Sequence, residues 1–155
     1  MTRDSFSASP DDIEVITFEI GEQSFCVDVR QVREIRGWSP ETPIPHAPAF
    51  LRGVINLRGA VLPIVDAALR LGRPATPPSA RSVIVVIEDG PRLAGLLVDD
   101  VSDIIVVSPN DFHPTPEIAA AGGEVHVDGL ICLDGRMVSR IAIRGFLPAE
   151  LPAAA

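Results

Sequence analysis

The sequence is poor in the residues that mark several large classes of protein. Only 5% of the residues are aromatic and two are cysteines, too few for the disulfide framework that holds small secreted domains together. The longest unbroken apolar run, residues 83–87, is far shorter than the ~20 residues of a membrane-spanning helix. The polar N-terminus lacks the apolar segment of a secretion signal. These absences predict a cytoplasmic protein without direct membrane insertion.

Positive charge is scarce as well. The chain carries a formal net charge of −8 and therefore repels the phosphate backbone of nucleic acids. The arginines of the first half are mixed with acidic residues, and no aromatic residues alternate with them. This mixture favours a surface that binds another protein and predicts no nucleic-acid partner.

The motifs of common enzymes and zinc sites are missing. His46, His113 and His126 lie far apart, and none has a second ligand three or four residues away. The sequence contains no P-loop, no nucleophile elbow and no dinucleotide-binding glycine motif. Nothing therefore requires an enzyme. An enzyme or small-ligand module built on strands is the alternative, and it predicts a deep polar pocket with convergent titratable groups.

The remaining candidates for chemistry are acids and thiols. Asp99, Asp100 and Asp103 follow a strand at a turn, where carboxylates are usually solvated and not metal-bound. Cys26 and Cys132 lie in apolar stretches, where a free thiol packs as a small hydrophobe, so both are expected to be buried. We expect neither a metal nor a cofactor.

Val, Ile and Leu are abundant, and they occur in short runs separated by turn residues. Such runs suit strands, because β-branched side chains pack well on a pleated surface. Asp28 is expected to cap a helical turn over residues 29–35, and Asp66 a short helix over residues 67–71. The strands are predicted at residues 14–20, 24–29, 50–56, 60–65, 82–88, 93–98, 100–107, 124–132 and 136–143. Eight or more short strands with turns between them predict a mainly all-β fold, either barrels or a sandwich, and two halves of about five strands each would suit two small barrels.

The composition also suggests how the chain is divided. Residues 1–12 are expected to be a disordered leader and residues 149–155 a disordered tail around a single domain, residues 13–148. The Pro-, Ala-, Ser- and Thr-rich residues 74–80 are expected to connect a first barrel, residues 13–73, to a second barrel, residues 81–146.

One hairpin is conspicuous. Residues 50–66 read Phe-Leu-Arg-Gly-Val-Ile-Asn-Leu-Arg-Gly-Ala-Val-Leu-Pro-Ile-Val-Asp, two apolar runs joined at a turn that displays Arg58. This stretch resembles the signature hairpin of the CheW-like family. Further stretches resemble family motifs in the same order: residues 18–37, 43–50, 95–104 and 129–137. The resemblance covers residues 13–146.

The resemblance implies two intertwined five-stranded SH3-like barrels without catalytic residues. Family members connect the cytoplasmic tip of methyl-accepting chemoreceptors to the regulatory domain of the histidine kinase CheA, which is itself CheW-like. The expected receptor mode is a helix in an apolar groove between the barrels. The receptor-binding residues carried over from the motifs are Val32, Glu34, Ile35, Arg58, Val101 and Ile104, with Glu34 and Arg58 as an ion pair. The kinase-binding residues, expected as exposed apolar surface, are Trp38, Pro45 and Phe50.

The C-terminal region departs from the family. Its final strand normally continues apolar into a well-formed terminal helix, whereas here Ser139 and Arg140 interrupt the apolar run. Gly145 and Pro148 are expected to cut the helix short. An adaptor of a non-flagellar chemosensory pathway, such as pilus-driven motility, is the alternative within the same family.

Overall fold

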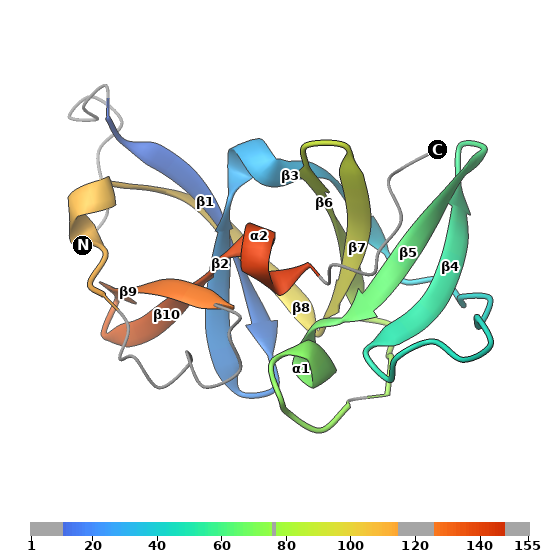
Figure 1. Cartoon of the computed structure of the whole chain (residues 1–155). Helices are drawn as coiled ribbons and strands as arrows, with labels where there is room; N and C mark the ends of the chain where they lie inside the picture. Colours follow the sequence, from blue (N-terminus) through green and yellow to red (C-terminus); the bar gives the residue numbers. More distant parts are fainter. Residues whose placement is uncertain (1–10, 76, 115–125, 148–155) are drawn as a thin grey trace.

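The computed structural model describes residues 11–75, 77–114 and 126–147 of the chain (Figure 1). Most of the leader expected at residues 1–12 and all of the tail expected at residues 149–155 lie outside the described residues.

Two five-stranded sheets lie side by side in the described part of the chain (Figure 1). The first has the order β8-β1-β2-β10-β9 and the second the order β3-β6-β7-β5-β4. The first sheet is built from β1 (Ile13–Ile20), β2 (Gln23–Asp28), β8 (Asp100–Val107), β9 (Val127–Leu133) and β10 (Arg136–Ile141). The second is built from β3 (Val32–Gly37), β4 (Leu51–Leu57), β5 (Ala60–Asp66), β6 (Val83–Asp89) and β7 (Arg92–Val98). The expected class, a mainly all-β fold of two five-stranded SH3-like subdomains, is confirmed.

The expected division into barrels at residues 13–73 and 81–146 is wrong. Strands β1 and β2 pair with β8 and β10, while β6 and β7 pair with β3 and β5. The chain therefore crosses between the sheets twice. The hairpins were readable because their turns are local, but the β2–β10 and β5–β7 pairs are parallel and join distant segments.

The described residues form a hydrophobic core of three parts. The largest, which we call the central cluster, takes residues from both sheets, including Phe18, Phe25 and Leu96. A second cluster lies within the sheet of strands β3, β4, β5, β6 and β7, which we call the β3–β7 sheet. A third lies within the sheet of strands β1, β2, β8, β9 and β10, which we call the β1–β10 sheet. Strand β6 explains the longest apolar run of the sequence: Val85 and Ile87 face the central cluster, while Ile84 and Val86 face the second cluster. A strand buried on both faces needs no polar alternation.

The helices in the described part of the chain are single turns. Asp28 caps η2 (Val29–Gln31), whereas the helical turn was expected to continue to residue 35. The chain instead enters β3, where the β-branched residues pair with β6 and burial alternates along the strand. A spacing of three residues also fits a strand that contains a bulge, which is why the pattern was ambiguous. The other turns are η3 (Pro109–Asp111) and α1 (Ala67–Arg70), which Asp66 caps as expected.

The C-terminal helix α2 (Ile143–Phe146) is as short as the sequence predicted, and it lies between the two sheets (Figure 1). Phe146 and Leu147 are fully buried in the central cluster. Arg70 of α1 donates from Nε to the carbonyl oxygen of Phe146 at 2.7 Å and lies over the ring of Phe50. Residues 143–147 are therefore part of the core that joins the two sheets.

Candidate protein-binding surface

The β4–β5 turn displays Arg58. Arg58 and Gly59 both have positive φ, 52° and 89°, as the two central residues of a type I′ hairpin turn require. The Asn56 side chain accepts a 2.8 Å hydrogen bond from the Gly59 amide and so closes the turn. Because the turn residues lie outside the core, the Arg58 side chain is 73% exposed.

Arg58 forms the ion pair that the resemblance implied. Its Nη1 donates to Oε1 of Glu34 at 2.7 Å, and the hydrogen bond holds the pKa of that carboxyl below its usual value. Glu34 lies on β3, which is one edge strand of the sheet, and Arg58 directly follows β4, which is the other edge strand. The pair therefore joins residues from opposite ends of the strand order.

The four apolar residues of the expected receptor surface fall into two groups. Val32 on β3 and Val101 on β8 are half-buried and pack against the central cluster, one from each sheet. Ile35 on β3 and Ile104 on β8 are 40% and 52% exposed. Both strands are sheet edges. Only the second group presents a substantial apolar side chain to solvent.

The residues expected to contact the kinase are less exposed than predicted. Trp38 is half-buried against the second cluster, and its Nε1 donates to Oε2 of Glu41 at 3.0 Å. Phe50 is half-buried against the central cluster beneath the guanidinium of Arg70. Only Pro45 is exposed. Trp38 and Phe50 flank apolar strands and pack on the clusters that those strands form. The prolines between them led to the expectation of an exposed loop.

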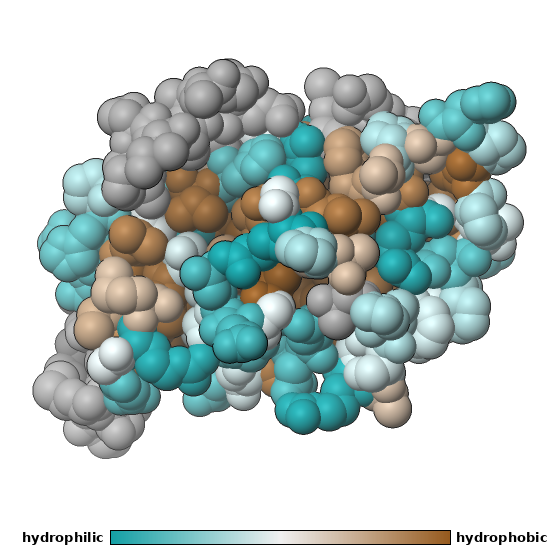
Figure 2. Space-filling model, turned by 90° about the horizontal axis from the view of Figure 1, so that it is seen from below, coloured by the Kyte–Doolittle hydropathy of each residue, from teal (hydrophilic) through white to brown (hydrophobic). Residues whose placement is uncertain are grey.

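Three exposed apolar residues were not singled out in the sequence. Ile44 is 39% exposed in the loop of residues 38–50, Val61 is 62% exposed on β5, and Met137 is 54% exposed on β10. The exposure of Ile44 could have been predicted, because it lies between two prolines in a segment that the sequence does not predict to be a strand. The exposure of Val61 was hidden, because the run around it is uniformly apolar. Figure 2 shows, on the face seen from below, apolar patches separated by hydrophilic residues.

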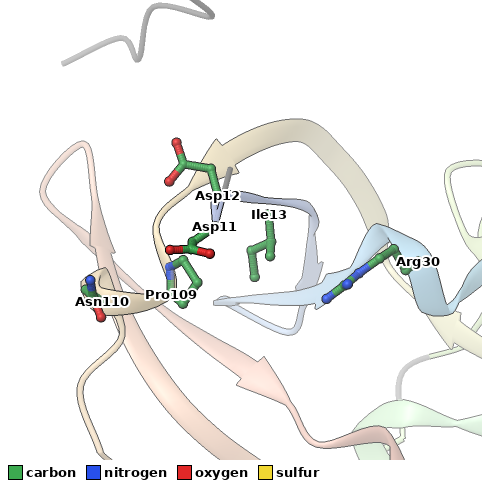
Figure 3. Close-up of a pocket in the computed structure, with 6 residues that line it drawn as sticks. All are labelled: Asp11, Asp12, Ile13, Arg30, Pro109 and Asn110. Atoms are coloured by element: carbon green, nitrogen blue, oxygen red, sulfur yellow. The ribbon is translucent and has the colours of Figure 1, made fainter. Parts of the chain in front are cut away.

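The structure also has two hollows of about 520 Å³, and none of the residues expected to bind the receptor or the kinase lines either of them. In the first, Arg30 approaches from one side of Ile13, while Asp11 lies beside Pro109 on the other (Figure 3). Arg30 and Asp28 form a 2.7 Å ion pair at the second hollow.

The second hollow contains more charge but no catalytic arrangement. Arg140 pairs with Asp128 at 2.6 Å, and its guanidinium lies 4.2 Å from the centre of the Phe112 ring. Its named carboxylates are therefore matched by arginines, and neither Cys26 nor Cys132 lines it. The convergent titratable pocket that the enzyme alternative required is not found at either hollow.

The acidic residues near the β7–β8 junction have separate partners. Asp99 accepts from the Gly21 amide, Asp100 pairs with Arg81 at 2.6 Å, and Asp103 accepts from the next backbone amide. Within residues 11–75, 77–114 and 126–147, no group of three or more His, Cys, Asp or Glu side chains is placed to hold a metal ion.

The two cysteines differ, although both were expected to be buried. Cys26 is buried in the third cluster, and burial raises the pKa of its thiol to about 12 against the opposing effect of Arg140. Cys132 is exposed, because alternation along β9 turns Ile131 inward and its neighbour outward. Among the described helices, none is long and apolar enough to cross a membrane.

The fold and the surface together define a β-barrel protein with exposed apolar residues on sheet edges and a surface ion pair. Residues 14–150 match the family described as the CheW-like domain, and the chain belongs to this family. It is 51% identical over 137 residues to the chemotaxis protein CheW of Rhizobium meliloti (strain 1021), covering 88% of each chain. It is 49% identical to the probable chemotaxis protein CheW of Rhizobium etli, also covering 88% of each.

A solved structure supports the same conclusion. The scaffolding protein TtCheW from Thermoanaerobacter tengcongensis superposes with a TM-score of 0.76 at 30% identity, covering 83% of this chain and 88% of that one. The chain is therefore a chemotaxis scaffold and not an enzyme.

Proposed function

We propose that this chain couples the cytoplasmic tip of methyl-accepting chemoreceptors to the regulatory domain of a CheA-type histidine kinase, using separate surfaces for the two partners. It acts in the cytoplasm, at the membrane-associated receptor array, because both partners are cytoplasmic domains. The observation that carries the assignment of surfaces is the Glu34–Arg58 ion pair on the edge of a CheW-like barrel.

The receptor surface consists of residues on β3, β8 and the β4–β5 turn. Receptor tips are helical, and an amphipathic helix needs apolar contacts with a polar group that fixes its orientation. Ile35 and Ile104 supply exposed apolar side chains, and Glu34 with Arg58 supplies an oriented pair of charges. Val32 and Val101 support this surface from the central cluster.

The kinase surface consists of the outward side chains of the loop of residues 38–50. Pro45 and Ile44 are exposed there, while Trp38 and Phe50 pack beneath the loop and hold it. We therefore keep all three carried-over residues, with Trp38 and Phe50 in a supporting role. Charged side chains are few at the tip of this loop, as in the core of a typical protein interface.

The receptor surface is tested by two substitutions that leave the core intact. Arg58→Ala and Ile104→Asp should each weaken binding to a receptor cytoplasmic fragment by about tenfold, because each removes an exposed contact of the surface. Binding to the kinase regulatory domain should be unchanged. Arg30→Ala is the matched control, since Arg30 also forms an exposed ion pair, to Asp28, but lies in η2 and not on β3, β8 or the β4–β5 turn.

Calorimetric titration measures each affinity, and circular dichroism checks folding. Equal loss of receptor and kinase binding, or loss of the fold in Arg58→Ala, would contradict the assignment. A pH series adds a second check. The hydrogen bond from Arg58 lowers the folded-state pKa of Glu34. The contribution of the Glu34–Arg58 pair to receptor binding should therefore still be present at the ordinary pKa of a glutamate, and it should be lost only as the pH falls through the lowered pKa.

A further inference from the structure

A network of buried charges fixes the loop of residues 38–50 to the sheet. The side chains of Glu41 and Asp66 are only 7% and 4% exposed, and Arg52 between them is 23% exposed. Arg52 donates to Glu41 through Nε at 2.6 Å and through Nη2 at 3.4 Å. Its Nη1 lies 3.7 Å from Oδ2 of Asp66, a buried oxygen with no hydrogen-bond partner among the described residues.

Each member of the network holds a different segment. Glu41 belongs to the loop and also accepts the indole N–H of Trp38. Arg52 belongs to β4. Asp66 ends β5, caps α1 through the Leu69 amide, and donates its own amide to the carbonyl of Phe50 at 2.7 Å. The network therefore connects the loop to the first strand of the β4–β5 hairpin and to the helix that follows the hairpin.

The backbone connects the loop at a second point. Thr42 and Val54 exchange two hydrogen bonds of 2.8 and 2.9 Å, so that the loop pairs briefly with the edge of β4. Gly53 makes this possible. A Cβ atom there would lie 2.3 Å from the Thr42 carbonyl oxygen, and its φ of 150° is one that other residues rarely adopt.

Buried ion pairs are a poor source of stability, because the loss of hydration offsets most of the attraction between the charges. Their advantage is directional, since a guanidinium that donates two hydrogen bonds to one carboxylate fixes both position and angle. A loop that is already in its bound shape also avoids the entropy loss of ordering on binding.

We propose that Arg52 is a positioning residue that, by bridging Glu41 and Asp66, holds the loop of residues 38–50 in a preformed shape for the kinase regulatory domain. The inference rests on the proposed function, because it takes the kinase as the partner of this loop. Arg52 itself contacts no partner. It acts through Glu41 and through the shape of the loop that displays Ile44 and Pro45.

Trp38 makes the proposal testable, because it is the only tryptophan in the chain and its indole N–H donates to Glu41. Its single indole resonance in a nitrogen–proton correlation spectrum therefore reports the state of the loop without any partner. Arg52→Met removes the charge and keeps the length of the side chain. Arg52→Lys keeps the charge but cannot donate in the same two-pronged way.

We expect Arg52→Met to move or broaden the indole resonance and to weaken binding of the kinase regulatory domain by about tenfold, with receptor binding unchanged. Arg52→Lys should restore part of the affinity. Glu41→Gln should give the same pattern as Arg52→Met from the other side of the contact, and it serves if Arg52→Met does not fold. Arg33→Met, an exposed arginine on β3, is the matched control and should change neither signal.

The outcomes separate the two proposals. Unchanged kinase affinity in a folded Arg52→Met protein whose indole resonance has moved would overturn the positioning role. An unmoved resonance would show that Arg52 does not fix the loop, and would overturn it too. Failure of the wild-type chain to bind the kinase domain would instead overturn the proposed function, whatever the indole resonance shows.

Discussion

The β4–β5 hairpin of one sheet and the β9–β10 hairpin of the other occupy the same place in the same strand order. Each is joined to the next hairpin of its sheet by a parallel pair, β5 with β7 and β10 with β2, and every other pair is antiparallel. An isolated bridge attaches a preceding segment to each: Thr42 pairs with Val54, and His113 with Leu130. The two sheets therefore have the same topology but a different starting point. The chain begins the first sheet at its second strand, β1, and the second sheet at its first strand, β3.

The similarity extends to individual positions. Both turns pair a residue of positive φ with glycine, Arg58-Gly59 in one and Asp134-Gly135 in the other. The second residue of each returning strand is an exposed apolar side chain, Val61 in β5 and Met137 in β10. A shared backbone therefore places turns and exposed side chains alike, even where the residues differ.

The hairpins differ at the single-turn helix that follows each. Asp66 caps α1 with its side chain, whereas Ala142 at the start of α2 makes no side-chain cap. In compensation, Arg70 of α1 donates to the Phe146 carbonyl of α2. Helix α1 is therefore held by its own cap, and α2 by burial and by its neighbour.

The largest test of this difference is Phe146→Ala. Phe146 is fully buried in the central cluster, so the substitution should lower the free energy of unfolding by about 3–5 kcal/mol. Arg144→Ala in the same turn is exposed and should change stability by less than about 0.5 kcal/mol. Urea denaturation followed by circular dichroism measures both. Similar small losses in both variants would show that α2 does not join the sheets.

The glycines at the third position of β4 and β9 provide the next test. Gly53→Ala should cost about 2–3 kcal/mol, because the added Cβ would overlap the Thr42 backbone and φ is positive. At Gly129 the nearest atoms, on Phe112 and Arg140, lie at 3.3 and 3.4 Å and belong to side chains. Gly129→Ala should therefore cost less than about 1 kcal/mol.

The same denaturation series decides this prediction. Equal losses in the free energy of unfolding for the two variants would mean that the Thr42 backbone moves aside as easily as the Phe112 side chain. The two isolated bridges would then be packed equally closely.

A cap can be added where the second hairpin lacks one. The backbone of Ala142 has φ −85° and ψ 94°, close to the −76° and 107° of Asp66. Ala142→Asp should therefore stabilise the protein by about 0.5–1 kcal/mol. Arg144→Asp, which places the acid inside the turn, is the control and should not stabilise. A melting curve without any gain for Ala142→Asp would show that the two helix starts are not equivalent.

The smallest effect distinguishes the two faces of the β1–β10 sheet. Cys132 should react with a maleimide within minutes at pH 7.5, while Cys26 should react only after unfolding, because burial raises its pKa to about 12. Mass spectrometry of the labelled native protein should find one adduct, on Cys132. Two adducts in native buffer would mean that the third cluster opens readily.

Part of the site was predictable from local chemistry. The turn that displays Arg58 follows from an apolar run on each side of a glycine, and the cap by Asp66 from an acid before a short helix. The exposure of Trp38 and Phe50 was wrongly predicted, because the clusters on which they pack are built from segments remote in sequence. The network around Arg52 was not anticipated, since ion-pair partners 11 and 14 residues away leave no spacing pattern.

The hairpins, their turns, the short C-terminal helix and the family could be predicted from the sequence, because each depends on neighbouring residues or on motifs in order. Which hairpins share a sheet depends on the folded chain, because parallel pairing between distant strands depends on which apolar faces meet. The same holds for the role of Phe146 in joining the sheets and for the link that Arg52 makes between Glu41 and Asp66. Burial makes those contacts specific, and burial is a property of the assembled core.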